Sequence, residues 1–507
     1  MSLAIINSRA NLGMTAPLVT IEVHLSPGLP SLSIVGLPEK AVKESKDRVR
    51  SAILNNGFRF PICRTVINLA PADLPKEGGR FDLPIALGIL AASEQIPKDK
   101  LQEYEFVGEL ALTGALKSVK GVLPMALITK EMNRSLLLPK TNAQEASLAS
   151  DLIIFAADHL LAVCAHLNAQ QPLEQYVSNS CNVTPLQLYP DLADVRGQIQ
   201  AKRALEIAAA GGHSILFTGP PGTGKTMLSS RLPGILPELT DSESLATAIV
   251  YSVSNHGFDA KNWQKRPFRA PHHTASSVAL VGGGNPPKPG EISLAHNGVL
   301  FLDELPEFNR HVLEALREPL EAGFVTISRA ARQEKFPSRF QFIAAMNPCP
   351  CGYQGDPSGR CNCNNESIAR YQNRLSGPLL DRIDMHITVP QLPPALLLDQ
   401  KKEKAESSET VRKRVLSARQ KQYKRSQMIN AQLIGENVMQ HCVIAEKDFA
   451  FLENAIMKLG LSARAYHRIL KLSRTIADLD DTDMIAQKHL QEALSYRLVK
   501  ATSVVIH

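Results

Sequence analysis

The chain has 507 residues, 44% of them hydrophobic and 21% charged, and its formal net charge at pH 7 is +7. This length allows about three domains, and so small an excess of positive charge does not by itself predict a nucleic-acid ligand. No secretory leader opens the chain and its apolar runs are too short to span a bilayer, so we expect a cytoplasmic protein without a membrane partner. Eight cysteines in so long a chain do not predict a secreted disulfide scaffold.

Residues 1–165 alternate short apolar runs with helical segments and predict an α+β domain. The runs LVTIEVHL, LSIVGL and TVINLA favour strands, whereas EKAVKESKDRVRSAILNNG favours a helix that ends at a glycine. Residues 166–190 are polar and contain proline, so we predict a linker there.

Residues 191–392 predict an α/β nucleotide-binding core built on a doubly wound parallel sheet. Its strand candidates are SILFTG, GVLFLDE, FQFIAAMN and MHITVP. Residues 393–430 are rich in charge and predict a linker, and residues 431–507 carry apolar stripes at helical spacing, which predict an all-helical C-terminal domain.

The first of these strand candidates runs into a glycine-rich loop that ends in Lys-Thr and continues as a helical pattern. In this context the loop predicts a nucleotide site, because its glycines let backbone N–H groups turn onto phosphates. Lys225 would reach the β and γ oxygens, and the Thr226 hydroxyl would ligate Mg²⁺. The predicted nucleotide-binding residues are Gly219, Pro220, Pro221, Gly222, Thr223, Gly224, Lys225 and Thr226.

An acidic pair follows the apolar run GVLFL. Asp303 would hold Mg²⁺, and Glu304 would polarise the attacking water. In isolation such a pair is more often a helix N-cap with charge in the first turn, but the phosphate loop upstream favours hydrolysis. Asn347 ends another apolar strand and is a candidate to bind the water and the γ-phosphate, although Asn-Pro alone is typical of a turn.

Two stretches near the C-terminal end contribute arginines. SGPLLDRID carries Arg382 after a Gly-Pro break, and LSARAYHRILKLSR places Arg464, Arg468 and Lys471 along one helix face. We expect Arg468 and Lys471 to lie on a solvated face.

The order of these motifs resembles the AAA+ ATPases of the magnesium-chelatase and minichromosome-maintenance branch, and the chain is most similar to the YifB/ComM family. The strings that carry this similarity over nearly the whole chain include SLSIVGLPEKAVKESKDRVRSA, INLAPADLPKEGGRFDLPIALGIL, FRAPHHTAS, NPCPCG and RLSGPLLDRID. The resemblance implies ATP as the nucleotide and a homo-hexameric ring that assembles on DNA and ATP. It also implies ATP-driven unwinding and branch migration of single-stranded and branched DNA in natural transformation, with recombination proteins as partners.

The resemblance assigns the separate roles within such an ATPase. It implies Walker A at residues 219–226, Walker B at Asp303 and Glu304, and sensor 1 at Asn347. Arg382 would be an arginine finger that acts on ATP bound by the neighbouring subunit, and Arg464 would be sensor 2 in a C-terminal helical lid. Two other functions stay open: a protein-remodelling motor like the chelatase subunits, and a DNA-binding scaffold that recruits recombination proteins.

A basic turn lies between Walker B and sensor 1. The stretch EAGFVTISRAARQEKFPSRF contains two β-prone runs around Arg329, Arg332 and Lys335. A lone basic turn is more often a solvated loop, but the resemblance implies a hairpin in the pore of the ring, where these cations would bind the phosphate backbone of DNA.

Four cysteines crowd into a turn-rich stretch as two C-x-C pairs, Cys349 with Cys351 and Cys361 with Cys363. Four thiolates suit a structural Zn²⁺, while the alternative is free cysteines in a reducing compartment. His272 and His273 are adjacent, so on a strand they would point to opposite faces. We therefore expect them to contact backbone or DNA in preference to a metal.

The N-terminal segment resembles the proteolytic domain of Lon, which has a ribosomal-S5-like fold, through APADLPKEGGRFDLPIALGIL and VGELALTGAL. The resemblance implies a nucleophilic serine after the glycine pair and a lysine after the second stretch. Arg80 and Phe81 occupy the serine region here, and KGVLPM offers no counterpart of the lysine. We expect a degenerate domain without peptidase activity.

Overall fold

The computed structural model describes residues 2–178, 189–329, 332–355, 359–393, 405–459 and 461–497. The backbone divides into two compact units. The N-terminal unit consists of Met1–Val183, Ser244–Trp263 and Glu334–Phe336, and the core unit consists of Thr184–Glu243, Gln264–Gln333 and Pro337–His507. Among the described residues, no helix has the length and apolar character needed to cross a membrane.

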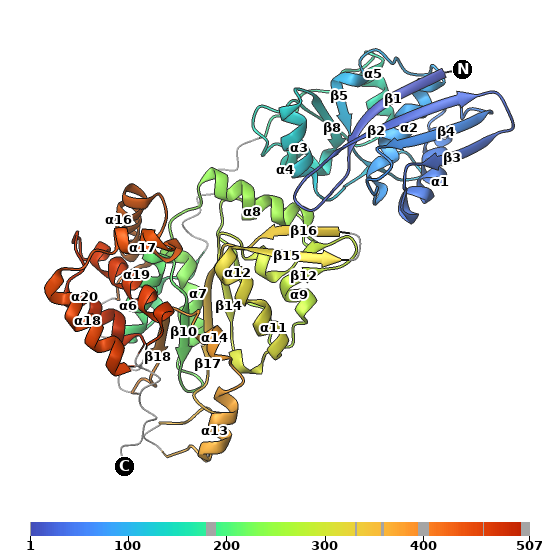
Figure 1. Ribbon diagram of the computed structural model, residues 1–507. Coiled ribbons are helices and arrows are strands. Elements are labelled where there is room, and N and C mark those ends of the chain that lie inside the picture. Colours follow the sequence, from blue (N-terminus) through green and yellow to red (C-terminus); the bar gives the residue numbers. More distant parts are fainter. Residues whose placement is uncertain are drawn as a thin grey trace. The chain divides into compact units, whose positions relative to one another are not determined.

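The N-terminal unit contains a mixed seven-stranded sheet in the order β3-β4-β2-β1-β5-β8-β9 (Figure 1). Its strands are β1 (Ser2–Arg9), β2 (Leu18–Ser26), β3 (Ser31–Val35), β4 (Arg64–Ala70), β5 (Tyr104–Phe106), β8 (Ser135–Pro139) and β9 (Ile154–Ala157). Strand β1 pairs antiparallel with β2 and parallel with β5. A small separate hairpin joins β6 (Glu109–Leu110) to β7 (Leu116–Lys117).

Helices bury both faces of the sheet around β8. Leu137 packs into the cluster formed with α1 (Lys40–Asn55), α2 (Asp82–Ala92) and α5 (Leu160–Leu167). Its neighbours Leu136 and Leu138 pack into a second cluster with α3 (Val122–Glu131) and α4 (Ala143–Ala146). Helix α1 ends near a glycine, as the sequence predicts. Gly57 follows the helix with φ +76°, a backbone conformation in which a side chain would be strained.

The core unit contains a five-stranded parallel sheet in the order β11-β14-β17-β10-β18. The strands are β10 (Ile215–Thr218), β11 (Phe268–Arg269), β14 (Val299–Leu302), β17 (Gln341–Met346) and β18 (Met385–Thr388). All four predicted strands are present, and the predicted parallel sheet is confirmed. Every residue of β14 and β17 is buried, as expected of central strands covered by helices on both faces.

Helices and short strands complete the core unit around this sheet (Figure 1). The elements before and beside the sheet are α6 (Ile199–Gly211), α7 (Lys225–Ile235), α8 (Asp241–Val253, which continues into the N-terminal unit), α9 (Ser277–Val281), β12 (Gly282–Gly283), β13 (Lys288–Pro289), α10 (Glu291–Leu294), α11 (Arg310–Ala315), α12 (Arg317–Ala322), β15 (Phe324–Arg329), β16 (Arg332–Pro337), α13 (Asn365–Gln372) and α14 (Gly377–Leu380). The C-terminal helices are α16 (Ser408–Ser426), α17 (Glu436–His441), α18 (Glu446–Leu459), α19 (Ala463–Leu479) and α20 (Gln487–Ser495).

The segment expected to be a charged linker, residues 393–430, contains the 19-residue helix α16. Val411, Val415 and Ala418 recur on one face of this helix and are buried in the cluster that also holds Phe217 of β10 and Ile469 of α19. The prediction was wrong for this part because the many charges lie on the opposite faces and hide a narrow apolar stripe. Residues 394–404 of the expected linker lie outside the described residues.

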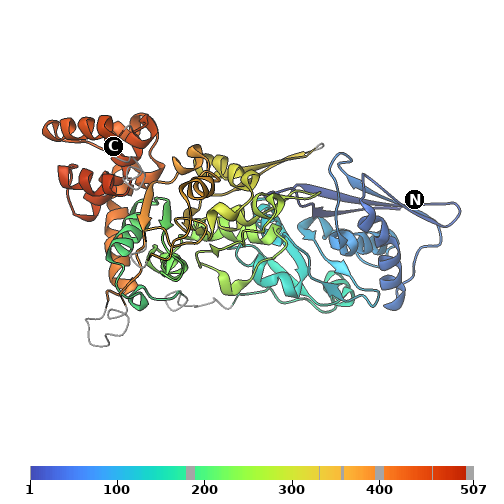
Figure 2. The same ribbon diagram turned by 90° about the horizontal axis from the view of Figure 1, so that it is seen from below.

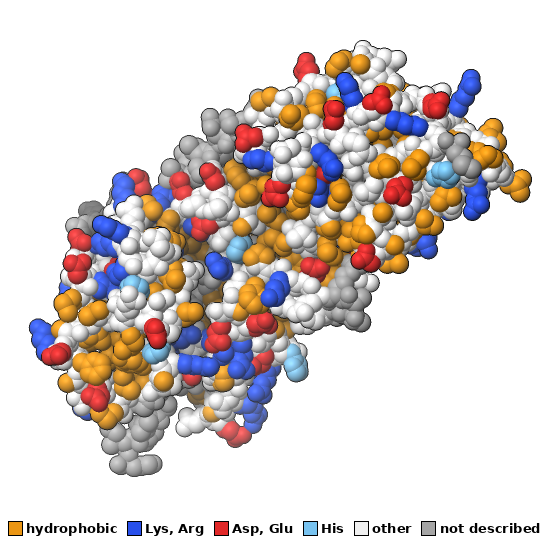
Figure 3. All heavy atoms as spheres, turned by 45° about the horizontal axis from the view of Figure 1, so that its top comes forward, with side chains coloured by type: hydrophobic (Ala, Val, Ile, Leu, Met, Phe, Trp, Pro, Cys, Tyr) orange, Lys and Arg blue, Asp and Glu red, His pale blue; other side chains and the backbone are white. Residues whose placement is uncertain are grey.

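Lysine and arginine side chains lie interspersed with acidic ones on the face drawn in Figure 3. This distribution agrees with the small net charge of +7. Any binding of nucleic acid by this chain therefore has to be argued from particular groups of cations.

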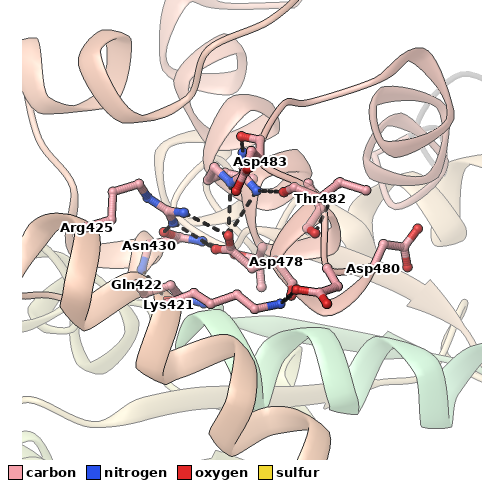
Figure 4. A network of polar contacts seen from close by, with 12 residues as sticks. Lys421, Gln422, Arg425, Asn430, Asp478, Asp480, Thr482 and Asp483 are labelled. Atoms are coloured by element: carbon pink, nitrogen blue, oxygen red, sulfur yellow. Dashed lines mark hydrogen bonds and ion pairs between the residues drawn. The ribbon is translucent and has the colours of Figure 1, made fainter.

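A buried carboxylate, Asp478, holds the C-terminal helices together (Figure 4). Its side chain is 1% exposed and forms ion pairs with Arg425 of α16 at 2.8 Å and with Arg474, one turn earlier in α19, at 2.9 Å. Asn430, in the turn after α16, donates a hydrogen bond to the same carboxylate at 2.8 Å. The carboxylate of Asp478 thus joins α16, the turn that follows it, and α19.

We predict that Asp478→Ala destabilises the C-terminal helices by about 3 kcal/mol, because it leaves two guanidinium groups without their buried partner. Hydrogen exchange followed by mass spectrometry should show faster exchange in α16 and α19. The control is Asp481→Ala, since Asp481 is 87% exposed and its pair with Lys421 lies in solvent. Equal exchange in the two variants would contradict the prediction.

Candidate active site

The glycine-rich loop connects β10 to α7 in the predicted way. Gly224 precedes the first residue of α7 and has φ +87°, and Gly222 has φ +76°, so both adopt a backbone that side chains rarely tolerate. The Gly219 N–H donates to the carbonyl of Met346, the last residue of β17, at 3.2 Å. The loop therefore starts beside the end of a neighbouring strand and leads into the N-terminus of α7, a position that favours the binding of an anion.

Lys225 brings the loop and Asn347 together. Its ammonium group donates to the carbonyls of Gly219 at 2.7 Å and Pro220 at 2.9 Å, and to Asn347 Oδ1 at 3.2 Å. Burial lowers the pKa of Lys225, while the charges of Asp303 and Glu304 oppose this shift. The two residues predicted to contact the γ-phosphate thus lie within hydrogen-bond distance of each other.

The two predicted magnesium ligands also meet. Thr226 Oγ1 donates to Asp303 Oδ2 at 2.6 Å, which joins the first turn of α7 to the end of β14. Hydroxyl and carboxylate oxygens are the ligands that Mg²⁺ prefers. The residues present therefore fit a magnesium ion held together with nucleotide phosphates.

Glu304 follows Asp303 in a left-handed backbone conformation with φ +52°. Its carboxylate is 53% exposed and lies 3.1 Å from Nδ1 of His273. The rings of His272 and His273 stand only 4.1 Å apart, so the expectation that they point to opposite faces was wrong. The physical reason is that the strand β11 ends at Arg269 and both histidines lie in the turn that follows.

The predicted arginine finger, Arg382, is held within its own chain. Its guanidinium is 8% exposed and pairs with Glu321 Oε1 at 2.8 Å, and it donates to the carbonyl of Pro378 at 2.8 Å. Arg464 is exposed in the first turn of α19. The roles of both arginines in hydrolysis stay predictions.

Arg468 and Lys471 do not lie on a solvated face, which corrects the sequence prediction. Arg468 pairs with the carboxylate of Asp384 and donates to the carbonyl of Arg382 at 2.6 Å. Lys471 donates to the carbonyls of Ala431 and Leu433, both at 2.9 Å. These partners lie far away in the sequence, so helical periodicity could not identify them.

Asp384 links the C-terminal helices to the sheet. Besides Arg468, its carboxylate accepts hydrogen bonds from the backbone N–H of Ser214 at 3.0 Å and from the hydroxyl of Ser214 at 3.1 Å. Burial raises the pKa of Asp384, but the charge of Arg468 and the hydrogen bond from His213 outweigh it and hold the pKa well below its ordinary value. Since Ser214 precedes β10, one carboxylate connects α19 to the strand that leads into the phosphate loop.

The four clustered cysteines lie together, and their sulfur atoms are all within 4.8 Å of one another. Cys349 Sγ is 3.3 Å from Cys351 Sγ and 3.8 Å from Cys361 Sγ. Four sulfurs at ~2.3 Å from a tetrahedral zinc ion would be about 3.8 Å apart, so the arrangement fits a Cys₄ site. A hydrogen bond from the Tyr353 backbone, aided by the Cys349 thiol, lowers the pKa of Cys351 to about 6, whereas burial and the neighbouring thiols raise the pKa values of Cys361 and Cys363.

The cysteine loop lies directly against the phosphate loop. Gly352, with φ +86°, is so close to Pro221 that a Cβ atom there would stand 2.7 Å from the proline Cδ. Asn347 is also near, with its Cγ at 3.7 Å from the same position. Any change in the shape of the cysteine loop would therefore reach the nucleotide loop through one contact.

The predicted basic hairpin is present as a two-stranded sheet of β15 and β16. Figure 2 shows its strands as a narrow ribbon, of which β15 belongs to the core unit and Glu334–Phe336 of β16 to the N-terminal unit. Arg329 ends β15 and Arg332 begins β16, while their side chains lie outside the described residues. Lys335 is exposed.

The residues in place of the Lon-type serine are buried. Arg80 is 5% exposed and donates to the carbonyl of Arg9 at 3.2 Å and to Asn11 Oδ1 at 2.7 Å. Phe81 is fully buried. Burial lowers the pKa of Arg80 to about 10, so this side chain remains a cation that ties together segments of the N-terminal unit.

Three family models match the chain. The model described as "Magnesium chelatase, subunit ChlI" matches residues 191–397. "Subunit ChlI of Mg-chelatase" matches residues 21–142, and "Magnesium chelatase, subunit ChlI C-terminal" matches residues 405–497. Together the three models cover both units.

Two curated relatives resemble the chain over almost its full length, and a third resembles part of it. The "Competence protein ComM" of Haemophilus influenzae is 56% identical over 98% of both chains. The "Uncharacterized protein YifB" of Escherichia coli is 52% identical over 98% of both chains. The "Magnesium-chelatase subunit ChlI" of Cyanophora paradoxa is 25% identical over 26% of this chain and 45% of its own.

We predict that the purified protein carries about one zinc ion per chain, bound by the four clustered thiolates. Cys349→Ser and Cys361→Ser should each lower the zinc content severalfold, as measured by elemental analysis after dialysis. Cys63→Ser is the control because this free cysteine lies in the N-terminal unit. A wild-type protein without zinc, prepared under reducing and chelator-free conditions, would show that the cluster is not a zinc site.

Proposed function

The chain belongs to the YifB/ComM family of magnesium-chelatase-like proteins, and from this membership we propose that it is a ring-forming AAA+ ATPase that unwinds and branch-migrates DNA. One observation supports the ATPase part above all others. Lys225 meets Asn347, and Thr226 meets Asp303, where three parallel strands end. Ligand sites of parallel α/β sheets lie at this edge.

The proposed chemistry assigns one task to each side chain. Lys225 binds the β and γ phosphate oxygens of ATP, and Thr226 and Asp303 hold Mg²⁺, which supplies charge stabilisation to the phosphates. Glu304 accepts a proton from the attacking water, and Asn347 orients that water against the γ-phosphate. Arg382 and Arg464 stabilise the charge that develops on the phosphate, Arg382 from the neighbouring subunit of a homo-hexamer.

DNA is the proposed substrate of the motor. The name of the Haemophilus relative, a competence protein, supports a role in the uptake and recombination of DNA during natural transformation. Arg329, Arg332 and Lys335 would contact phosphates from a hairpin between Walker B and sensor 1. We propose single-stranded and branched DNA as ligands and other recombination proteins as partners, in the cytoplasm.

A second candidate function is a protein-remodelling motor. It is favoured by the family models, whose descriptions name a magnesium chelatase subunit. A third is a DNA-binding scaffold in which the N-terminal unit, a degenerate Lon-like domain without peptidase activity, recruits partners. Stimulation of ATP hydrolysis by DNA separates the DNA motor from the protein-remodelling motor.

We predict that Lys225→Ala abolishes ATP binding, whereas Glu304→Gln binds ATP and hydrolyses it at least ~100-fold more slowly. The difference arises because Lys225 contacts phosphate in the ground state and Glu304 acts on water. Binding is measured with a fluorescent ATP analogue and turnover by phosphate release. Glu318→Gln, on the exposed side of α12, is the control and should hydrolyse ATP as the wild type does. Wild-type turnover by Glu304→Gln would remove this residue from its role.

We predict that replacing Arg329, Arg332 and Lys335 together by alanine preserves basal ATP hydrolysis but removes its stimulation by DNA and the migration of branched DNA. These cations would contact phosphates without reading bases, so binding should weaken on every sequence and its salt dependence should become shallower. The control replaces Lys40, Lys43 and Lys117, exposed cations of the N-terminal unit, and removes the same charge. Wild-type branch migration with an unchanged salt slope would show that DNA is bound elsewhere.

A further inference from the structure

Arg80 joins two loops of the N-terminal unit. Its guanidinium donates to the carbonyl of Arg9 at 3.2 Å and to Asn11 Oδ1 at 2.7 Å, where the chain leaves β1. It also donates to the carbonyl of Lys120, in the loop before α3. Asn11 Nδ2 donates to the same carbonyl at 3.0 Å, so both side chains link the two loops. The residue in the region where the resemblance to Lon implies a serine is therefore a tie between loops.

The loop at Lys120 receives the end of helix α8. The N–H of Gly121 donates to the carbonyl of Ser252 at 3.0 Å, and Lys120 Nζ donates to the carbonyl of Asn255 at 3.3 Å. The Ser252 hydroxyl is buried and donates to Glu145 Oε1. The last carbonyls of a helix have no partner within it, so these contacts fix the end of α8. All five residues belong to the N-terminal unit.

The loop that contains Asn11 contacts strand β16. Gly13 has φ +53°, and a Cβ atom there would overlap Oε2 of Glu334. Phe336, two residues further along the strand, is fully buried. These residues of β16 belong to the N-terminal unit, as Gly13 does. The two loops joined by Arg80 therefore hold both the end of α8 and a part of β16.

The chain passes between the two units inside regular elements. In α8 the division falls between Glu243 and Ser244, and in β16 it falls between Gln333 and Glu334. The first turn of α8 is held in the core unit, where Asn297 Nδ2 donates to the carbonyl of Glu243 at 3.1 Å. Helices and strands are stiffer than flexible linkers, so a displacement of one end is carried to the other.

We propose that Arg80 is a positioning residue that couples the nucleotide state of the core unit to the β15–β16 hairpin. The route begins at the phosphate loop, because α8 follows α7, whose first residue is Lys225. A displacement of α8 moves the loop at Lys120, and Arg80 transmits this movement to the loop at Asn11. That second loop contacts Glu334 of the hairpin.

This inference rests on the DNA-motor function proposed above. It gives the N-terminal unit a part in the movement of the hairpin, in a region where the resemblance to Lon implies peptidase chemistry. Arg80 touches neither nucleotide nor DNA in this arrangement. Its effect should therefore be seen in the response of ATP hydrolysis to DNA, while ATP binding and basal hydrolysis are unaffected.

The test compares two substitutions in the full-length protein. Arg80→Ala removes the hydrogen bonds of the guanidinium, whereas Asn11→Ala removes two hydrogen bonds and leaves the buried arginine in place. Both variants should keep wild-type basal hydrolysis and lose DNA stimulation severalfold, with the larger loss in Arg80→Ala. The maximum should fall while the DNA concentration at half-maximal stimulation stays unchanged, because the cations of the hairpin are intact. Asn55→Ala is the matched control, since Asn55 donates to the carbonyl of Leu112 elsewhere in the same unit.

Hydrogen exchange followed by mass spectrometry measures the coupling without DNA. In the wild type, exchange in residues 11–15 should differ between the ADP state and the state with a non-hydrolysable ATP analogue. Arg80→Ala should retain this difference in α8 and lose it in residues 11–15, and Asn11→Ala should reduce it there. Circular dichroism checks that the variants fold. If Arg80→Ala does not fold, the result for Asn11→Ala decides.

The outcomes separate this inference from the function on which it rests. Wild-type maximal stimulation in the folded variants would overturn the inference, and so would a higher half-maximal DNA concentration with an unchanged maximum. Exchange in residues 11–15 that ignores the nucleotide would also overturn it and leave the DNA motor in place. If DNA fails to stimulate the wild type while this exchange follows the nucleotide and depends on Arg80, the coupling stands and the DNA-motor function falls.

Discussion

The parallel pairing of β10, β14 and β17 is the constraint on which the rest of the site depends. Thr218 lies opposite Met346 and Leu302 lies opposite Ala344, so the three strands end close together. The loops that leave them begin with Gly219, Asn347 and Asp303. Because the strands run parallel, the loops that follow them leave from the same edge of the sheet. This edge brings Lys225 within hydrogen-bond distance of Asn347, 122 residues away in the sequence. Moving one strand by a single residue would carry its polar side chain to the other face of the sheet.

The contiguous parts of this site could be predicted from sequence alone. The phosphate loop, the acidic pair after β14 and Asn347 each follow an apolar run whose burial is confirmed. Periodicity could not predict the partners of Arg468 and Lys471, because a cation on a helix reveals nothing about a carboxylate 84 residues away. The same limit applies to Glu321, which pairs with Arg382, and to His273, which pairs with Glu304. Helix α16 was missed because charges outnumber its buried apolar residues.

The C-terminal helices and the sheet share one hydrophobic cluster, which contains Phe217, Val415 and Ile469. Interiors of this density transmit small displacements instead of absorbing them. The ion pair between Arg468 and Asp384 adds a polar link at the point where β10 and the residues beside Arg382 meet. A movement of the C-terminal helices would consequently be felt both by the phosphate loop and by the arginine predicted to act on a neighbouring subunit.

The contact between Gly352 and Pro221 places the loop that carries the clustered cysteines next to the loop predicted to bind phosphate. The phosphate loop, residues 219–226, contains no cysteine, so by its own composition it is indifferent to oxidants. The loop that presses on it carries Cys349 and Cys351, and their thiols change shape and charge when oxidised. Oxidation of these thiols would change the surroundings of Gly352 and would therefore be felt at Pro221 of the phosphate loop.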